Sequence, residues 1–331
     1  MKYESNTTLQ VAAQKMRVAR KVVVTTHAKP DGDAFGSVIA LCEVLKRQQT
    51  DVTALFMPPI PSGLKNICGE LKLTTYQDGY ELPEADLYVV VDTGAWSQVA
   101  PIREQLEKYL DKTLIIDHHI SGDIPAAFKH IDSKAAACCE IIAKFVDELM
   151  AHVFEDKVVS NALYVGIATD TGWFKFSNTR PQTHELAARL IAAGVDHAAL
   201  YAQSEQTERP EKLKLMIRAL SSLELLNKDS AAVMVLRKAD FTETGALPEE
   251  TERFVDIPQV VSSVQVVVLI CEPLDDSPIR ISFRSKPGKN AVNVADLAAN
   301  FNGGGHTRAA GAKCDGDLDE VLAKVKNLLT A

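Results

Sequence analysis

Apolar runs and amphipathic segments alternate along the first half of the chain. Near-continuous apolar runs, rich in β-branched residues, occur at 22–26, 51–56, 87–91 and 113–116. Such runs are typical of strands that are buried on both faces of a sheet. Segments with helical periodicity occur at about 34–47, 135–150 and 156–169. This alternation predicts βαβ units and a mostly parallel sheet, which makes the first half an α/β domain.

The second half has a different order of elements. Helical patterns extend from 183 to 193 and from 197 to 226, with Pro210 as a helix start. Strands are then predicted at 231–237, 264–271 and 279–284, and helices at 294–300 and 318–329. A length of 331 residues favours two domains. We therefore expect an N-terminal domain over 1–190, a helical linker over 191–215, and a smaller α/β C-terminal domain over 216–331.

Composition and charge exclude several classes of protein. The chain has 36 basic and 44 acidic residues and a net charge of −8. Because long nucleic acid is bound mainly by Lys and Arg, this balance argues against long nucleic acid as a partner. The six cysteines form no CxxC pair, and no apolar signal core or membrane-length segment occurs. We expect a cytoplasmic protein with reduced thiols and no membrane partner.

Metal-ligand residue types follow the predicted strands. His27, Asp31 and Asp33 come after the first strand and Asp92 after the third, while the fourth is followed by an Asp-His-His triplet at 117–119. A predicted helix ends near Asp170. Each segment alone has a plain structural alternative, such as a turn, a helix cap or a packed core histidine. Together they are expected to meet at one sheet edge, because ligands of open α/β sheets bind at the carboxyl ends of the strands.

Carboxylates and imidazoles in this number suit two divalent ions held close together. Paired ions about 3.5–4 Å apart are a common means of hydrolysing phosphate esters by in-line attack. The sequence therefore predicts a metal-dependent hydrolase.

These segments, in this order, resemble the motifs of a known superfamily. The motifs of the DHH phosphoesterases are resembled, in order, by His27-x-x-Pro-Asp31-x-Asp33, Asp92, Asp117-His118-His119 and Thr-Asp170-Thr-Gly. The run Gly-Gly-Gly-His-Thr-Arg-Ala-Ala-Gly at 303–311 resembles the signature of the DHH-associated C-terminal domain. The resemblance implies an active site in a cleft between the two domains.

The resemblance also implies roles for single residues. The implied metal ligands are His27, Asp31, Asp33, Asp92, His118 and Asp170, with Asp92 bridging two ions. His119 is expected to face the scissile phosphate as a donor or general acid, and Asp117 to orient a ligand or close the turn. The ions are expected to be Mn²⁺, with Mg²⁺ or Co²⁺ as alternatives.

The C-terminal motif is expected to bind substrate. Three glycines allow close approach to a ligand, and their N–H groups can form an anion-binding nest. An arginine on the preceding strand can grip a phosphate with two hydrogen bonds. The expected substrate-binding residues are Arg284, Gly303, Gly304, Gly305, His306 and Arg308. The structural alternatives are a flexible turn and a surface ion pair.

Within the superfamily, the chain looks most like the compact oligoribonuclease (nanoRNase) type. That resemblance implies hydrolysis of short RNA oligonucleotides, including pApA, to mononucleotides, and of 3′-phosphoadenosine 5′-phosphate (pAp) to AMP. The alternatives are a cyclic-dinucleotide phosphodiesterase, a manganese-dependent inorganic pyrophosphatase, and a nucleotide-binding sensor without turnover. A homodimer is expected by family analogy only.

Overall fold

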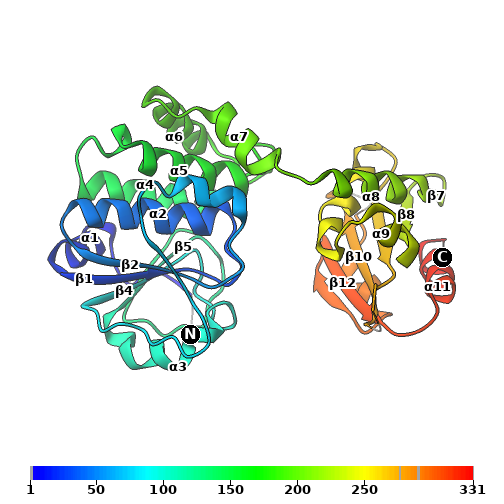
Figure 1. Ribbon diagram of the computed structural model, residues 1–331, viewed down its shortest axis with the longest axis horizontal. Coiled ribbons are helices and arrows are strands. Elements are labelled where there is room, and N and C mark those ends of the chain that lie inside the picture. The colour runs from blue at the N-terminus through cyan, green and yellow to red at the C-terminus, as the bar shows by residue number, and fades with distance from the viewer. Residues whose placement is uncertain (1–2, 276, 289–290, 331) are drawn as a thin grey trace. The chain divides into compact units, whose positions relative to one another are not determined.

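The computed structural model describes residues 3–275, 277–288 and 291–330. The chain divides into two units, Met1–Thr207 (unit 1) and Glu208–Ala331 (unit 2), and each has its own sheet and its own helices (Figure 1). The division between them falls inside the segment 191–215 that was predicted to be the linker.

Unit 1 is built on a parallel sheet with strand order β3-β2-β1-β4-β5-β6. All five strand pairings in it are parallel, as predicted. Its strands are β1 (Lys21–Thr25), β2 (Asp51–Phe56), β3 (Leu73–Thr75), β4 (Leu87–Val91), β5 (Thr113–Asp117) and β6 (Phe128–Ile131). From β1 the chain continues through β2 and β3 to one edge of the sheet, and from β4 it continues through β5 and β6 to the other edge. The switch in strand order therefore lies between the neighbouring strands β1 and β4.

Helices cover both faces of this sheet. Figure 1 shows α2, α4 and α5 on one face and α3 on the other. Strand residues alternate between the two layers: Val22 and Val24 pack in the core under α2, whereas Val23 belongs to the opposite core. The helices of unit 1 are α1 (Leu9–Val18), α2 (Gly32–Arg47), α3 (Arg103–Leu106), α4 (Cys138–Leu149), α5 (Lys157–Asp170), α6 (Pro181–Ala192) and α7 (His197–Glu205).

Small residues let α2 and α5 pack with their backbones in contact. A Cβ atom on Gly36 would lie 2.3 Å from the carbonyl oxygen of Ala162, and one on Gly32 would lie 2.3 Å from Oγ1 of Thr169. A side chain at either glycine would therefore force the helices apart. The contact holds the start of α2 against the end of α5, where Asp33 and Asp170 lie.

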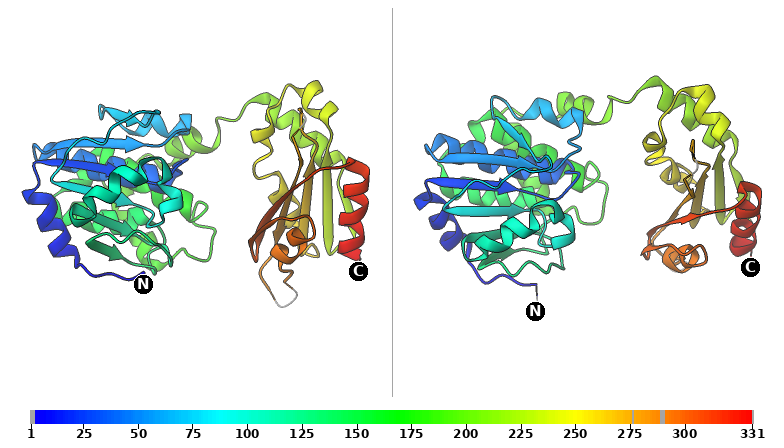
Figure 2. Two further views of the ribbon diagram at one scale, coloured as in Figure 1. Left: turned by 90° about the horizontal axis from the view of Figure 1, so that it is seen from below. Right: turned by 60° about the horizontal axis from the view of Figure 1, so that its bottom comes forward.

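Unit 2 contains a mixed sheet with strand order β11-β12-β10-β9-β8-β7. Within it β8 and β9 are parallel, and the other pairings are antiparallel. The strands are β7 (Glu224–Leu226), β8 (Ala231–Leu236), β9 (Val266–Cys271), β10 (Ile279–Ser285), β11 (Gly304–His306) and β12 (Ala309–Cys314). The helices are α8 (Pro210–Ser221), α9 (Lys238–Thr244), α10 (Val294–Ala299) and α11 (Leu318–Thr330) (Figure 2).

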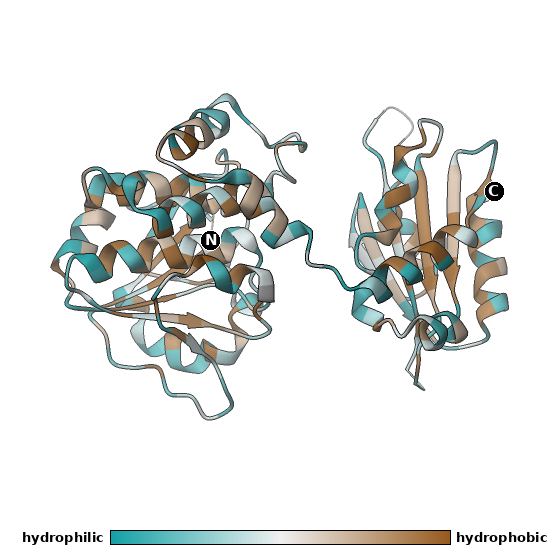
Figure 3. Ribbon diagram, turned by 45° about the horizontal axis from the view of Figure 1, so that its top comes forward, coloured by the Kyte–Doolittle hydropathy of each residue, from teal (hydrophilic) through white to brown (hydrophobic). Residues whose placement is uncertain are grey.

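Strand β10 shows how unit 2 separates its two faces. Ile279, Ile281 and Phe283 are buried in the core, whereas Arg280 and Arg284 alternate with them and are only half-buried. The central strands of the unit are accordingly hydrophobic, and polar residues concentrate on the outer surfaces of the helices (Figure 3).

The helix start predicted at Pro210 is confirmed: α7 ends at Glu205 and α8 begins at Pro210. The extension of the helical pattern to 226 is wrong, because 224–226 form β7. Arg209 is extended, as expected of a residue that precedes proline. Within the glycine run, Gly304–His306 form strand β11, which pairs in antiparallel register with Ala309–Gly311.

Short 3₁₀ helices complete the chain at Ser62–Ile67, Trp96–Gln98, Ala100–Ile102, Glu107–Lys112, Val153–Glu155, Pro248–Thr251 and Phe254–Val260. Among the described residues, no helix has both the length and the apolar character that a bilayer crossing requires.

Candidate metal centre

The predicted ligands of unit 1 converge at the carboxyl edge of its sheet. His27 follows β1 and Asp92 follows β4, so these two residues flank the switch in strand order. His118 follows β5, the next strand of the sheet. Ligand sites of open α/β sheets form at this position.

Two imidazoles are held in the same tautomer. Nδ1 of His27 lies 3.0 Å from the carbonyl oxygen of Ala28, and Nδ1 of His118 lies 3.3 Å from that of Ala135. A carbonyl oxygen only accepts hydrogen bonds, so Nδ1 carries the proton in both rings. In the neutral form, each Nε2 then has a lone pair available to a metal ion.

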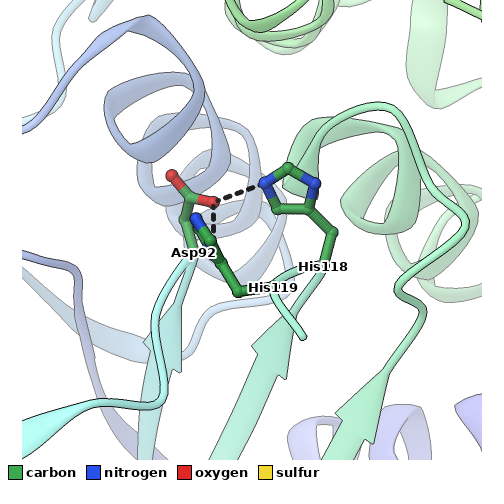
Figure 4. Close-up of side chains that lie close together, drawn as sticks. All are labelled: Asp92, His118 and His119. Atoms are coloured by element: carbon green, nitrogen blue, oxygen red, sulfur yellow. Dashed lines mark ion pairs between the residues drawn. The ribbon is translucent and has the colours of Figure 1, made fainter. Parts of the chain in front are cut away.

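Asp92 lies between these two nitrogens. Its Oδ1 is 3.3 Å from Nε2 of His118 and its Oδ2 is 3.5 Å from Nε2 of His27 (Figure 4 shows Asp92 with His118 and His119). The carboxylate is buried, and among the described residues its Oδ1 accepts no hydrogen bond. The backbone of Asp92 has a left-handed φ of 59°, which is unusual for a residue other than glycine. Each oxygen of Asp92 thus faces a different imidazole.

Asp33 and Asp170 close the other side of the cluster. Oδ2 of each carboxylate lies 3.9 Å from Nε2 of His118. Asp33 is 1% exposed and accepts the N–H groups of Cys138 and Cys139 at 2.5 and 2.7 Å. These amides belong to the first turn of α4, where the helix dipole favours a negative charge.

Asp31 completes the cluster and also caps α2. Its Oδ1 accepts the N–H groups of Asp33 and Ala34, both at 3.0 Å, and lies 3.9 Å from Nε2 of His27. The same aspartate therefore starts the helix and faces the centre.

The electrostatics of the cluster favour a bound cation. Burial, together with the charges of Asp92 and Asp170, raises the pKa of Asp33 well above its usual range. Burial raises the pKa of Asp170 to about 6. Burial lowers the pKa values of His27 and His118, but their contacts with Asp92 outweigh it and bring these values to about 9 and about 10. A bound cation would offset the charges that these buried carboxylates carry when ionised.

Three groups of side chains each bring their ligand atoms within 4.8 Å of one another, namely His27/Asp31/Asp92, Asp33/His118/Asp170 and Asp92/His118/His119. Together these groups contain all six ligands expected from the sequence. Asp92 belongs to two of them, which suits a residue that bridges two ions. The buried carboxylates, the Oδ1 of Asp92 that accepts no hydrogen bond among the described residues, and the Nε2 atoms of His27 and His118 fit a pair of divalent ions.

His119 is placed differently from His118. Its Nδ1 lies 2.7 Å from Oδ1 of the buried Asp117, which also accepts the N–H groups of His118 and His119 at 2.8 and 3.1 Å. This carboxylate orients His119, whose side chain is 53% exposed, and raises its pKa. Nε2 of His119 is left for a ligand.

Two contacts in the centre were not foreseen from the sequence. The side chain of Asn178 donates to the carbonyl oxygens of Ala136 and Asp170 at 3.0 and 3.1 Å, which ties the segment after α5 to the end of that helix. The other contact is the pair of α4 amides on Asp33. Backbone donors have no sequence signature, and Asn178 has none that separates it from any loop asparagine.

The expected substrate-binding residues of unit 2 are only partly grouped. Arg284 and Gly303 line a pocket of about 700 Å³, together with Arg280 and Lys313. His306 is exposed on β11. Arg308 is not part of the pocket lining; its Nη1 donates to the carbonyl oxygen of Lys286 at 2.9 Å.

Comparison with known proteins agrees with the geometry. The model of the DHH family, N-terminal domain, matches residues 21–167, and the model of the DHHA1 domain matches residues 228–331. This chain is a DHH-family protein. The first match contains five of the six clustered ligands, and the second contains all the expected substrate-binding residues. Members of the DHH phosphoesterase family are hydrolases, and this chain is accordingly an enzyme of that class.

Several relatives match over nearly the whole DHH-DHHA1 chain. The bifunctional oligoribonuclease and PAP phosphatase NrnA of Thermus thermophilus is 29% identical over 94% of this chain and 92% of its own length. The protein of the same name from Bacillus subtilis is 28% identical over 93% of this chain and 94% of its own. An exopolyphosphatase-related protein from Bacteroides fragilis, known as a crystal structure, has a TM-score of 0.84 at 25% identity, covering 97% of this chain and 94% of that one.

Proposed function

We propose that this chain is a cytoplasmic phosphoesterase with two divalent ions that hydrolyses short oligoribonucleotides, including pApA, to mononucleotides and pAp to AMP. The observation that carries the proposal is the position of Asp92, whose two oxygens lie 3.3 and 3.5 Å from the Nε2 atoms of His118 and His27. A carboxylate that faces two imidazoles in this way suits a bridge between two ions. The two relatives named for oligoribonuclease and PAP phosphatase activity support the substrates.

One ion would be held by His27, Asp31 and Asp92, and the other by Asp33, His118 and Asp170. Asp92 would be shared with the second ion, since its Oδ1 lies 3.3 Å from Nε2 of His118. Mn²⁺ suits this mixture of imidazole and carboxylate ligands. Such ions activate water for attack on phosphorus and offset the charge that develops on the phosphoryl oxygens.

The side chains around the centre have their own tasks. Asp117 holds Nδ1–H of His119, so Nε2 of that ring can donate a proton to the departing oxygen of the substrate. The amides of Cys138 and Cys139 hold both oxygens of Asp33 and orient this side chain toward the centre. We also propose that Arg284 and the glycines at 303–305 bind a terminal phosphate of the nucleotide, since Arg284 and Gly303 line the same pocket.

The test is a Mn²⁺-dependent assay on four substrates: pAp, pApA, a five-nucleotide RNA and inorganic pyrophosphate. We expect turnover of the nucleotides and none of pyrophosphate, and loss of turnover in His118→Ala. The matched control is His152→Ala, because His152 is 82% exposed and lies outside the cluster. Turnover of pyrophosphate alone would show that the chain is an inorganic pyrophosphatase. Tight binding of a nucleotide without formation of product would show that it is a nucleotide-binding sensor.

A further inference from the structure

The hydroxyl of Tyr3 reaches the edge of the sheet that carries the metal ligands. It donates a hydrogen bond to Oδ2 of Asp117, a residue 114 positions away in the sequence. The other oxygen of Asp117 accepts Nδ1–H of His119 at 2.7 Å. A single buried carboxylate thus connects Tyr3 to His119.

The segment that carries Tyr3 is anchored along β6. The N–H of Asn6 donates to the carbonyl oxygen of Lys129 at 2.9 Å, and the side chain of Asn6 accepts the N–H of Lys129 at 2.7 Å. The hydroxyl of Ser5 donates to the carbonyl oxygen of Ile131 at 2.9 Å and accepts its N–H at 2.7 Å. These paired hydrogen bonds fix the path of the chain immediately after Tyr3.

The ring of Tyr3 fills a space that two glycines leave open. A Cβ atom on Gly94 would lie 2.0 Å from the hydroxyl oxygen of Tyr3, and one on Gly122 would lie 2.4 Å from its ring atom Cε2. Gly94 follows the ligand Asp92 by two residues, and Gly122 follows His119 by three. Burial, and then the charge of Asp117, raise the pKa of Tyr3, so the phenol stays protonated and remains a donor.

We propose that Tyr3 is a positioning residue for His119 that acts through Asp117. The proposal rests on the proposed function of His119 as a proton donor to the substrate. Oδ1 of Asp117 already receives the two amides and the imidazole, so Oδ2 is the atom through which a further donor can stop the carboxylate from turning. With both oxygens held, Nδ1–H of His119 stays engaged and Nε2 stays directed away from Asp117.

The first test is Tyr3→Phe, which removes the hydroxyl and keeps the ring between the glycines. We expect kcat for pApA to fall about 10-fold, the lower end of what loss of an orienting hydrogen bond costs at metal sites. KM for pApA and the affinity for Mn²⁺ should not change. The matched control is Tyr88→Phe, which also removes a hydroxyl, one that donates to the carbonyl oxygen of Pro83 at 2.8 Å. Wild-type kcat in Tyr3→Phe would overturn the proposal.

A double-mutant cycle separates positioning from general support of the fold. In a His119→Ala background, Tyr3→Phe should cause no further loss of kcat, because the residue it acts on is gone. An equal loss in both backgrounds would show that Tyr3 acts on the fold and not on His119. If the wild-type enzyme turned over no nucleotide at all, the proposed function would fail, not this inference.

A second measurement does not depend on turnover. In protein labelled with ¹⁵N-histidine, Tyr3→Phe should shift the ring resonances of His119 and leave those of His130 unchanged, since the ring of His130 instead contacts the carbonyl oxygen of Thr7 and the ring of Phe145. Unchanged His119 resonances would overturn the proposal even if His119→Ala were inactive.

Discussion

Oδ1 of Asp92 lies 3.3 Å from Nε2 of His118, although Asp92 has a left-handed backbone that most residues avoid. The amide of Asp92 is fixed by a 3.0 Å hydrogen bond to the carbonyl oxygen of Ile116 on the neighbouring β5. Main-chain pairing of β4 and β5 therefore sets the direction of this carboxylate. The left-handed backbone of Asp92 directs its side chain toward both His27 and His118, which gives this unfavourable conformation a role in the site.

We expect Asp92→Ala to reduce hydrolysis at least about 1000-fold, because the loss of a shared ligand removes several kcal/mol of transition-state stabilisation. The fold should persist, since the amide bond to Ile116 remains. Circular dichroism and a nucleotide assay check both points. The control is Asp86→Ala at the opposite end of β4, where the carboxylate accepts the amides of Arg20 and Lys21. Turnover close to wild type in Asp92→Ala would contradict the two-ion assignment.

Manganese binding at pH 7 should release protons. In the metal-free protein the pKa values of His27 and His118 are about 9 and about 10, so both rings are protonated at pH 7 and must lose a proton to bind a metal. The two rings should contribute about two protons per protein to this release, and Mn²⁺ affinity should rise with pH. Calorimetry in buffers with different ionisation enthalpies measures it, and His118→Ala should release fewer protons. Release near zero in the wild type would show that the two imidazoles are not ligands.

Asp170→Asn should stabilise the metal-free protein at high pH. The pKa of Asp170 is raised from 3.8 to about 6 in the folded state, so its favourable contribution is present below the unfolded value and is lost as pH rises through 6. In chelator at pH 8, we expect the variant to be more stable by about 1–3 kcal/mol, with little difference at pH 4. Urea unfolding measures both values. With Mn²⁺ added, the wild type should become the more stable of the two proteins, because only the wild type retains the carboxylate at position 170. If Mn²⁺ stabilised the variant as much as the wild type, Asp170 would not be a ligand.

Arg284→Ala should raise KM for pApA about 10- to 100-fold, since a hydrogen bond to a charged group contributes about 1.5–3 kcal/mol. Arg284→Lys should recover only part of this loss, because an ammonium group cannot form the two parallel hydrogen bonds of a guanidinium. Steady-state kinetics with Mn²⁺ in excess measures the change. The control is Arg218→Ala, which removes an exposed arginine paired with Glu243. An unchanged KM would exclude Arg284 from substrate binding.

Gly36→Ala should destabilise the protein by about 1–3 kcal/mol, the usual cost of overpacking. Its new Cβ would lie 2.3 Å from the carbonyl oxygen of Ala162, so α2 and α5 must separate. Thermal unfolding measures this cost, and Mn²⁺ titration should show weaker binding because Asp33 and Asp170 lie on these two helices. The control is Gly304→Ala, whose Cβ would meet no atom within 4 Å and should leave the melting temperature unchanged.

The parts of the fold that the sequence revealed are those with a strong apolar pattern. The strand β4 has the bounds predicted for it because it is an uninterrupted apolar run, and β2 also has its predicted bounds although it contains Asp51 and Thr53. Edge strands β3 and β6 were missed, since their residues are mostly half-buried and mix polar with apolar types. Strands β11 and β12 were missed because glycine and alanine give no alternation of hydrophobic and polar positions.

The residues of the candidate site also fall into those that a sequence pattern predicts and those that it does not. All six proposed ligands stand next to elements that could be predicted, so strand order alone brings them together. Tyr3 and Asn178 could not be found from the sequence, because their side chains hydrogen-bond to residues in other segments of the chain. The placement of such partners depends on main-chain paths, such as that of residues 5–7 along β6, which no local pattern encodes.

The backbone contact between α2 and α5 has a consequence for the choice of ion. Ions of different radius need different spacings between Asp33 and Asp170, and the approach of these two helices is limited where Gly36 of α2 meets Ala162 of α5. A directed-evolution search for an enzyme that prefers a smaller or larger cation should therefore vary this helix interface and keep every ligand. Homologues that differ there would be expected to differ in metal preference even with identical catalytic motifs.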